Sequence, residues 1–148
     1  MLGDISFKRI EEVKGALIRA ARTIWENPES GYHEFIASDV CAGLLEEAGF
    51  QVERRCGGLP TALRAEWGSG SPVIGLLGEF DALPGLSQKD VCRREPVEEG
   101  GWGHGCGHCL MCPADIGALI GLKDEMREKH IKGTVVFYAC PAEETVGG

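Results

Sequence analysis

An uninterrupted apolar segment near the end of the chain limits the possible folds more than any other sequence feature. The segment runs from Val135 to Cys140, follows Gly133-Thr134 and contains no charged residue. A short apolar run that is rich in β-branched and aromatic residues and begins after a turn signal is typical of a buried strand. The sequence therefore predicts a sheet that other elements cover.

Apolar residues at helical spacing predict three helices, over about residues 6–25, 35–48 and 116–126. Asn27-Pro28 forbids continuation of the first helix, because the residue before a proline is pushed out of the helical region. Gly49 stands where a glycine C-cap would end the second helix. These segments alternate with candidate strands, as expected for a layered domain.

Three further strands are expected between the second and third helices. Residues 50–56 alternate between apolar and polar side chains, the period of a half-buried strand. Residues 61–67 and 73–77 flank a stretch rich in glycine, serine and proline, so we expect them to form a hairpin whose second strand is central and buried. Residues 78–103 show no apolar period and predict a long functional loop. The fold class expected is α/β, a layered domain with a mixed sheet.

Composition and charge exclude several classes of protein. The 148 residues carry a net charge of −8, which disfavours nucleic acid as a partner. No apolar run is long enough to span a bilayer, and the first residues lack the basic and apolar regions of a secretory signal. An odd number of cysteines in periodic segments favours a reducing compartment, and we expect a cytoplasmic protein. The seven cysteines are Cys41, Cys56, Cys92, Cys106, Cys109, Cys112 and Cys140.

Two short segments contain the candidate metal ligands. His104, Cys106 and His108 are separated only by glycines, which let the backbone approach whatever their side chains bind. In extended backbone, Cys106 and His108 would project to the same side and share one ion. Glu143 and Glu144 follow the buried strand after Pro141, where charged groups need a partner such as a metal. Together these residues predict metal-assisted hydrolysis.

Each candidate also has an ordinary structural interpretation. Cys106 and His108 can be a buried thiol and a hydrogen-bonded imidazole, and adjacent glutamates are usually solvated. Asp81, which follows the strand expected at 73–77, can cap a turn. In a metal site, its carboxylate would instead accept the N–H of a ligating imidazole and fix the orientation of the ring.

Two redox interpretations compete with the hydrolytic one. Cys106 and Cys109 form the CxxC pattern of thiol-disulfide oxidoreductases. With Cys112 they also match part of an iron–sulfur ligand run, for which Cys140 or Cys92 would be the fourth thiol. Neither interpretation accounts for the glutamate pair.

Four motifs, in this order along the chain, resemble one known family. They are Asn27-Pro-Glu-Ser-Gly31, Gly78-Glu-Phe-Asp-Ala-Leu-Pro-Gly-Leu-Ser-Gln88, His104-Gly-Cys-Gly-His108, and the strand at 133–137 followed by Pro141-Ala-Glu-Glu144. They resemble the co-catalytic metallopeptidases and amidohydrolases, a family that includes aminoacylases, auxin-conjugate hydrolases and, most similar of all, p-aminobenzoyl-glutamate hydrolases.

The resemblance implies a role for each candidate residue. Cys106, His108 and Glu144 would be metal ligands, Glu143 the general base and Asp81 the orienting carboxylate. The complete site would hold two divalent metal ions, commonly manganese or zinc. The substrate would be a small N-acyl or p-aminobenzoyl amide of an amino acid, and the complete enzyme a homo- or hetero-oligomer.

The chain departs from the family pattern in two respects. Cys109 and Cys112 stand where relatives usually carry Asn or Asp and a small residue. In addition, the family's remaining histidine ligands and its lid or dimerisation domain would lie beyond Gly148. We therefore expect residues 1–148 to be the N-terminal part of a catalytic domain without the lid. The non-enzymatic alternative is a truncated metal-binding fragment.

Overall fold

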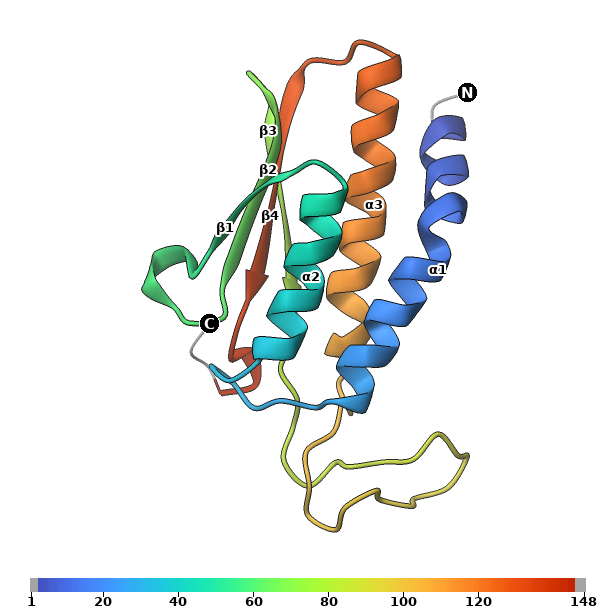
Figure 1. The fold of residues 1–148 in the computed structure, drawn as a ribbon, viewed down its shortest axis with the longest axis vertical. Helices are drawn as coiled ribbons and strands as arrows, with labels where there is room; N and C mark the ends of the chain where they lie inside the picture. The colour runs from blue at the N-terminus through green and yellow to red at the C-terminus, as the bar shows by residue number, and fades with distance from the viewer. Residues whose placement is uncertain (1–2, 146–148) are drawn as a thin grey trace.

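The computed structural model describes residues 3–145 and consists of a four-stranded sheet with three long helices (Figure 1). Residues 1–2, which bear on the expected absence of a secretory signal, lie outside the described part. The elements are α1 Asp4–Glu26, α2 Phe35–Glu47, β1 Gln51–Arg54, η1 Cys56–Gly58, β2 Leu63–Ser69, β3 Val73–Glu79, α3 His108–Glu128, β4 Gly133–Cys140 and η2 Glu143–Thr145. The expected mixed α/β architecture and the first two helices are confirmed.

The sheet has the strand order β1-β2-β4-β3, with β4 antiparallel to β2 and parallel to β3. The expected hairpin between residues 61–67 and 73–77 is therefore wrong, because β4 lies between β2 and β3 and pairs with both. β4 is the apolar strand that the sequence predicts to be buried. Val135 and Phe137 are nearly or fully inaccessible to solvent. The most apolar strand takes the central position, where both of its edges are hydrogen-bonded and its side chains are best covered.

β3 lies at the edge of the sheet, so the expectation that it is central and buried is also wrong. Val73 and Leu77 are 65% and 66% exposed. Only part of the strand is covered, where Leu76 packs against the core and Gly78 lies against α3. The apolar run at 73–77 resembles a buried strand because sequence hydrophobicity does not report which neighbours a strand acquires.

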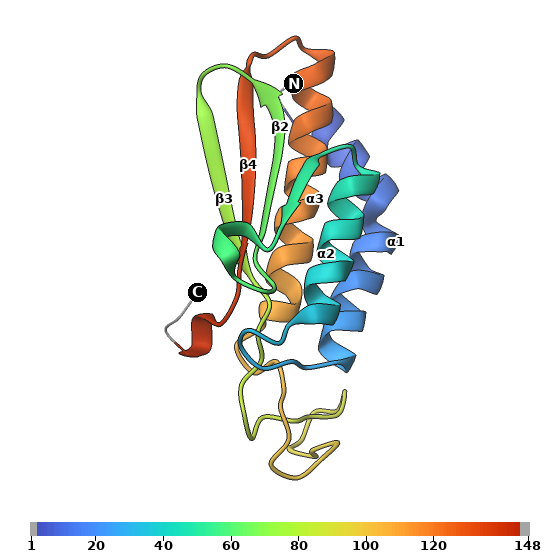
Figure 2. The same cartoon turned by 60° about the vertical axis from the view of Figure 1, so that its left-hand side comes forward.

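The three helices cover one face of the sheet, as Figure 2 shows from the side. α2 and α3 pack on the sheet and α1 packs on α3. A Cβ atom at Gly117 would lie 2.7 Å from Leu17 Cδ1, and one at Gly121 would lie 3.0 Å from the Ser6 carbonyl oxygen. These two glycines therefore let α1 approach α3 closely. No helix among residues 3–145 is long and apolar enough to cross a membrane.

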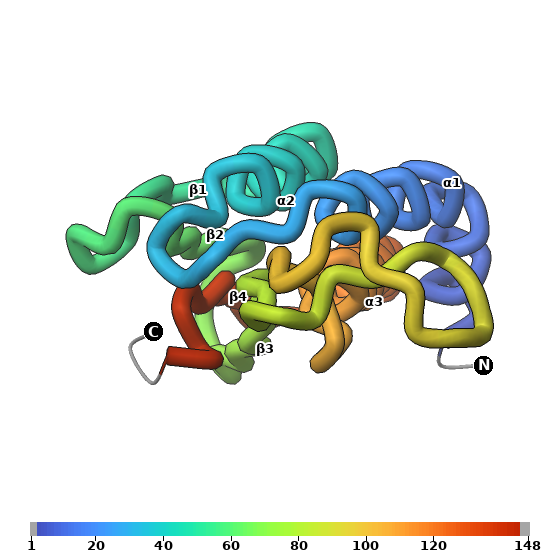
Figure 3. Tube along the Cα trace, turned by 90° about the horizontal axis from the view of Figure 1, so that it is seen from below, coloured from blue at the N-terminus to red at the C-terminus, as the bar shows by residue number. Residues whose placement is uncertain are grey.

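Connecting segments from distant parts of the sequence meet at one end of the molecule (Figure 3). They are residues 27–34, the long segment 80–107 and the turn η2. The backbone N–H of Ala82 donates to the Glu29 carbonyl oxygen, and Leu83 and Gly103 exchange two hydrogen bonds that close the base of the long segment. The sequence-based expectation of a long irregular segment after β3 is thus confirmed, and this segment lies beside the carboxyl ends of β3 and β4.

Candidate metal centre

His108 is the first residue of α3 and is buried, with 2% of its surface exposed. Gly107 precedes it with a φ of 96°, in the left-handed region that favours glycine. The sequence predicts extended backbone at Cys106–His108 and a helix from about residue 116. The first prediction is wrong, because the turn at Gly107 starts the helix at His108. The helix itself is confirmed over residues 116–126, but it begins earlier than expected and includes Cys109 and Cys112.

The two ring nitrogens of His108 have different surroundings. Nδ1 lies 3.0 Å from Asp81 Oδ1 and 3.1 Å from the Asp81 carbonyl oxygen, so it carries a proton and donates it to acceptors of Asp81. Nε2 lies 3.0 Å from Glu79 Oε2, 3.8 Å from Glu143 Oε2 and 3.9 Å from Glu144 Oε1. In the neutral ring, Nε2 carries a lone pair that faces three carboxylates. These groups repel one another unless a proton or a cation lies between Nε2 and the carboxylate oxygens.

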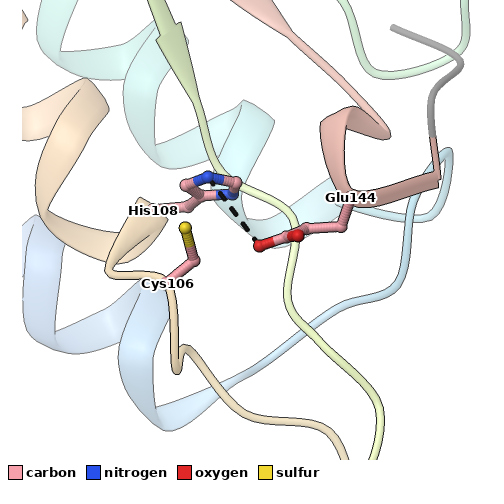
Figure 4. Close-up of side chains that lie close together, drawn as sticks. All are labelled: Cys106, His108 and Glu144. Carbon is pink, nitrogen blue, oxygen red and sulfur yellow. Dashed lines mark ion pairs between the residues drawn. The ribbon is translucent and has the colours of Figure 1, made fainter.

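Cys106, His108 and Glu144, the three residues expected as ligands, lie together (Figure 4). One donor atom from each lies within 4.8 Å of the others. The three side chains point toward a common centre from two segments, the segment at the start of α3 and the turn η2. Glu144 Oε1 is buried and accepts no hydrogen bond from the described residues. A sulfur, an imidazole nitrogen and an orphaned carboxylate oxygen form a donor set that suits Zn²⁺ and similar divalent ions.

A second cluster, formed by Glu79, His108 and Glu143, meets the same distance criterion. Glu79 is not among the candidates that the sequence motifs predict. The signal that would have found it is its spacing from Asp81, because residues i and i+2 at the end of a strand project to one side. Desolvation, followed by the charges of nearby carboxylates, raises the pKa of Glu79, while His108 opposes the shift.

The electrostatics of the site fit a bound cation. Desolvation and the neighbouring Glu144 carboxylate raise the pKa of the Cys106 thiol. No lysine or arginine among the described residues forms an ion pair with Glu79, Glu143 or Glu144. A divalent ion would neutralise these carboxylates and favour the thiolate, so the residues present fit the metal that the motifs predict.

A buried carboxylate holds the turn that carries Glu143 and Glu144. Glu34 is fully buried and accepts hydrogen bonds from Thr61 Oγ1 at 2.6 Å and from the Ala142 backbone N–H at 2.8 Å. Ala142 has a φ of 59°, in the left-handed region. The Glu144 N–H in turn donates to Asp81 Oδ2 at 2.9 Å. Asp81 thus contacts both His108 and the backbone of Glu144, and Glu34 fixes Ala142, the residue before Glu143.

The remaining candidates lie outside the two clusters. His104 Nε2 donates to the Ile24 carbonyl oxygen at 3.1 Å, and burial lowers the pKa of the ring. Cys109 and Cys112 are buried on α3, and Cys112 Sγ donates to the Glu79 carbonyl oxygen. The groups of three donors found among residues 3–145 contain one cysteine at most. The iron–sulfur alternative therefore has no geometric support in the described part of the chain.

Comparisons with known proteins identify the family to which the chain belongs. The pattern of Peptidase family M20/M25/M40 matches residues 75–148, which include all the residues of both clusters. A p-aminobenzoyl-glutamate hydrolase subunit of Escherichia coli (strain K12) is 46% identical over 129 residues, which cover 86% of this chain and 27% of that protein. The IAA-amino acid hydrolase ILR1-like 6 of Arabidopsis thaliana is 36% identical, and the match covers 89% of this chain and 27% of that protein.

The fold has close counterparts among solved structures. The Bacillus subtilis YXEP protein, described as a dinuclear metal binding peptidase from the M20 family, superposes with a TM-score of 0.77 at 29% identity. The match covers 93% of this chain and 38% of that one. The chain thus spans about a third or less of the length of the curated relatives it matches. By its family pattern and its fold, the chain belongs to Peptidase family M20/M25/M40.

Proposed function

We propose that this chain supplies part of the catalytic domain of a metal-dependent amidohydrolase that cleaves an N-acyl or p-aminobenzoyl amide of an amino acid. The observation that carries the proposal is the convergence of Cys106, His108 and Glu144 on one centre, with Glu143 beside it. The similarity to a p-aminobenzoyl-glutamate hydrolase supports this choice of substrate class.

In this proposal Cys106, His108 and Glu144 hold a Mn²⁺ or Zn²⁺ ion, and Asp81 orients the His108 ring through Nδ1. The metal, when bound, would acidify a water molecule and polarise the amide carbonyl. Glu143, which lies next to the ligands and is exposed, takes the proton of the attacking water and delivers it to the leaving amine. Glu79, which contacts Nε2 in the second cluster, would contribute to a second ion.

The two clusters share His108, and one imidazole nitrogen can bind only one ion. A two-metal site therefore needs ligands beyond residues 3–145. We propose that residues 1–148 form the N-terminal part of the catalytic domain, with further ligands and a lid domain elsewhere in the polypeptide. The complete enzyme would be an oligomer, an inference supported by the description of one relative as a hydrolase subunit.

Metal binding tests the ligand assignment. Equilibrium dialysis against Zn²⁺ or Mn²⁺, followed by elemental analysis, should show at least about tenfold weaker binding for Cys106→Ser and Glu144→Ala. Cys92→Ser and Glu128→Ala are matched controls, because both residues are exposed and lie outside the clusters. Unchanged metal binding in both ligand variants would refute the assignment.

Hydrolysis tests the role of Glu143. Glu143→Gln should retain metal binding but lose release of p-aminobenzoate from p-aminobenzoyl-glutamate, since an amide cannot accept the proton. In the 148-residue chain alone we expect little hydrolysis, because the described residues supply one ligating imidazole. Robust activity of that chain would contradict the proposal that further metal ligands lie outside residues 3–145.

A non-catalytic metal-binding role is the second candidate, and it is favoured by the same single imidazole. The reading frame distinguishes the two. Continuation past Gly148 into a histidine-bearing segment is expected for the enzyme, whereas a stop codon directly after Gly148 would favour the non-catalytic fragment.

A further inference from the structure

A cavity of about 560 Å³ lies between the end of α1 and the long segment that precedes α3. Its apolar walls are formed by Trp25, Trp102, Leu86 and Val97. Cavities of several hundred cubic ångströms with aromatic walls and a few polar groups are typical of sites for small organic ligands. None of its lining residues belongs to the metal clusters.

The wall carries carboxylate acceptors beside the indole N–H donors of Trp25 and Trp102. Glu98 contributes a carboxylate, and Glu26 another whose charge is offset by Arg22 at 2.9 Å. His104 also lines the cavity, and because Nε2 donates to the Ile24 carbonyl, Nδ1 is left without a partner among the described residues. No lysine or arginine is among the described residues that line the cavity. These walls suit a planar group that donates N–H hydrogen bonds and disfavour a carboxylate.

The cavity adjoins the candidate metal centre along the chain. Gly105 lines the cavity and immediately precedes Cys106. Leu86 packs on this backbone so closely that a Cβ atom at Gly105 would lie 2.4 Å from Leu86 Cδ1. The glycine between His104 and Cys106 thus brings a wall of the cavity next to a proposed ligand.

We propose that this cavity binds the aromatic, amine-bearing acyl group of the amide substrate, whereas the amino-acid carboxylate is bound elsewhere. This inference rests on the proposed function for the identity of the ligand. Trp25 and Trp102 provide the aromatic contacts, and the Glu98 carboxylate accepts a hydrogen bond from the amine of the ligand.

NMR titration of the metal-free chain with 4-aminobenzamide tests the inference. The chain has three tryptophans, and Trp67 lies in β2, outside the cavity. The indole N–H signals of Trp25 and Trp102 should therefore shift saturably while that of Trp67 stays constant. For a ligand of about ten heavy atoms, a Kd on the order of 1–10 mM is expected.

Variants identify the contacts. Trp102→Ala should weaken binding about threefold to tenfold, which is the usual contribution of an aromatic contact. Phe7→Ala, a truncation of an exposed aromatic residue at the far end of α1, should leave the Kd unchanged. The anionic 4-aminobenzoate should bind more weakly than 4-aminobenzamide, and Glu98→Gln should reduce that difference.

Absence of a saturable shift at Trp25 and Trp102, or an equal shift at Trp67, would overturn the inference. So would binding of 4-aminobenzoate as tight as that of the amide. Because the titration needs neither metal nor turnover, its failure is distinguishable from failure of the proposed reaction, which the dialysis and hydrolysis experiments report separately.

Discussion

At the scale of single residues, His108 connects the two clusters. Its Nδ1 is committed to Asp81, so Nε2 alone faces the carboxylates of Glu79, Glu143 and Glu144. A hydrogen-bonded carboxylate behind a ligating histidine fixes the tautomer and makes the ring a better ligand. Asp81 is 1% exposed, so its orientation is set by these contacts and not by solvent.

Asp81→Asn should therefore weaken Zn²⁺ binding about 10- to 100-fold. The amide leaves the size of the side chain unchanged but presents a weaker acceptor, or a donor, to Nδ1–H. Isothermal titration calorimetry measures the change. Asp90→Asn, an exposed substitution of the same kind, is the control, and equal affinities of the two variants would contradict the orienting role.

At the scale of elements, the turn η2 depends on a residue from a different segment. Glu34, just before α2, accepts hydrogen bonds from Thr61 and from the Ala142 backbone, and so joins three connections at one end of the molecule. Gly31 packs against Ala142, where a Cβ atom would lie 2.8 Å from the alanine Cβ. The position of the glutamate pair is therefore set by tertiary contacts.

Glu34→Ala should lower the free energy of unfolding by roughly 2–4 kcal/mol, because two buried donors lose their acceptors. The same change should weaken metal binding by releasing the turn before Glu143. Glu29→Ala removes a carboxylate that accepts from the N–H groups of Ile36 and Ala37, and should cost about 0.5–2 kcal/mol without affecting metal affinity. Urea denaturation and metal dialysis check both variants, and equal metal affinity in the two would argue against a positioning role for Glu34.

The edge position of β3 gives a second prediction at this scale. Leu77→Ser should change the free energy of unfolding by less than about 0.5 kcal/mol, since the side chain is 66% exposed. Phe137→Ala in the adjacent central strand should cost about 3–5 kcal/mol, because that ring is fully buried. Guanidinium denaturation measures both, and a large loss in Leu77→Ser would indicate that β3 is covered in this chain.

At the scale of the whole molecule, Glu125 joins the beginning of α1 to the end of α3. It accepts hydrogen bonds from the backbone N–H groups of Gly3 and Ser6, both at 3.0 Å, and pairs with Lys129. The Lys129 contact, followed by the Gly3 N–H, lowers the pKa of Glu125 from 4.5 to about 2. The carboxylate thus takes the place of a side-chain cap, which α1 lacks at its own N-cap residue.

A carboxylate whose pKa is lower in the folded state than in the unfolded state stabilises the protein at pH values above its unfolded-state pKa. This contribution disappears as the pH falls through the folded-state pKa. The contribution of Glu125 should therefore be complete above about pH 5 and be lost between about pH 4.5 and 2. Urea midpoints measured across this range should fall less steeply in Glu125→Gln than in the parent chain. Glu128→Gln, an exposed neighbour, should follow the parent profile, and an unchanged profile in Glu125→Gln would contradict the linkage.

The sequence alone determined the features that depend on local pattern. The helical period of α1 and α2, the apolar composition of β4 and the long irregular segment after β3 each follow from the residues of one segment. Local pattern also selected the candidate site residues. Glycines flank Cys106 and His108, and an apolar strand directly precedes Asp81 and the glutamate pair. Their roles as ligands, base and orienting residue stay predictions.

Only the tertiary structure decided how these segments combine. It placed β4 between β2 and β3, put β3 at the edge, and brought Glu79 and Glu34 to the site. Strand order and contacts between distant segments depend on the packing energy of the whole chain, which leaves no periodic signal in any single segment. For this protein, the sequence identified the chemical groups, and long-range packing determined which of them meet.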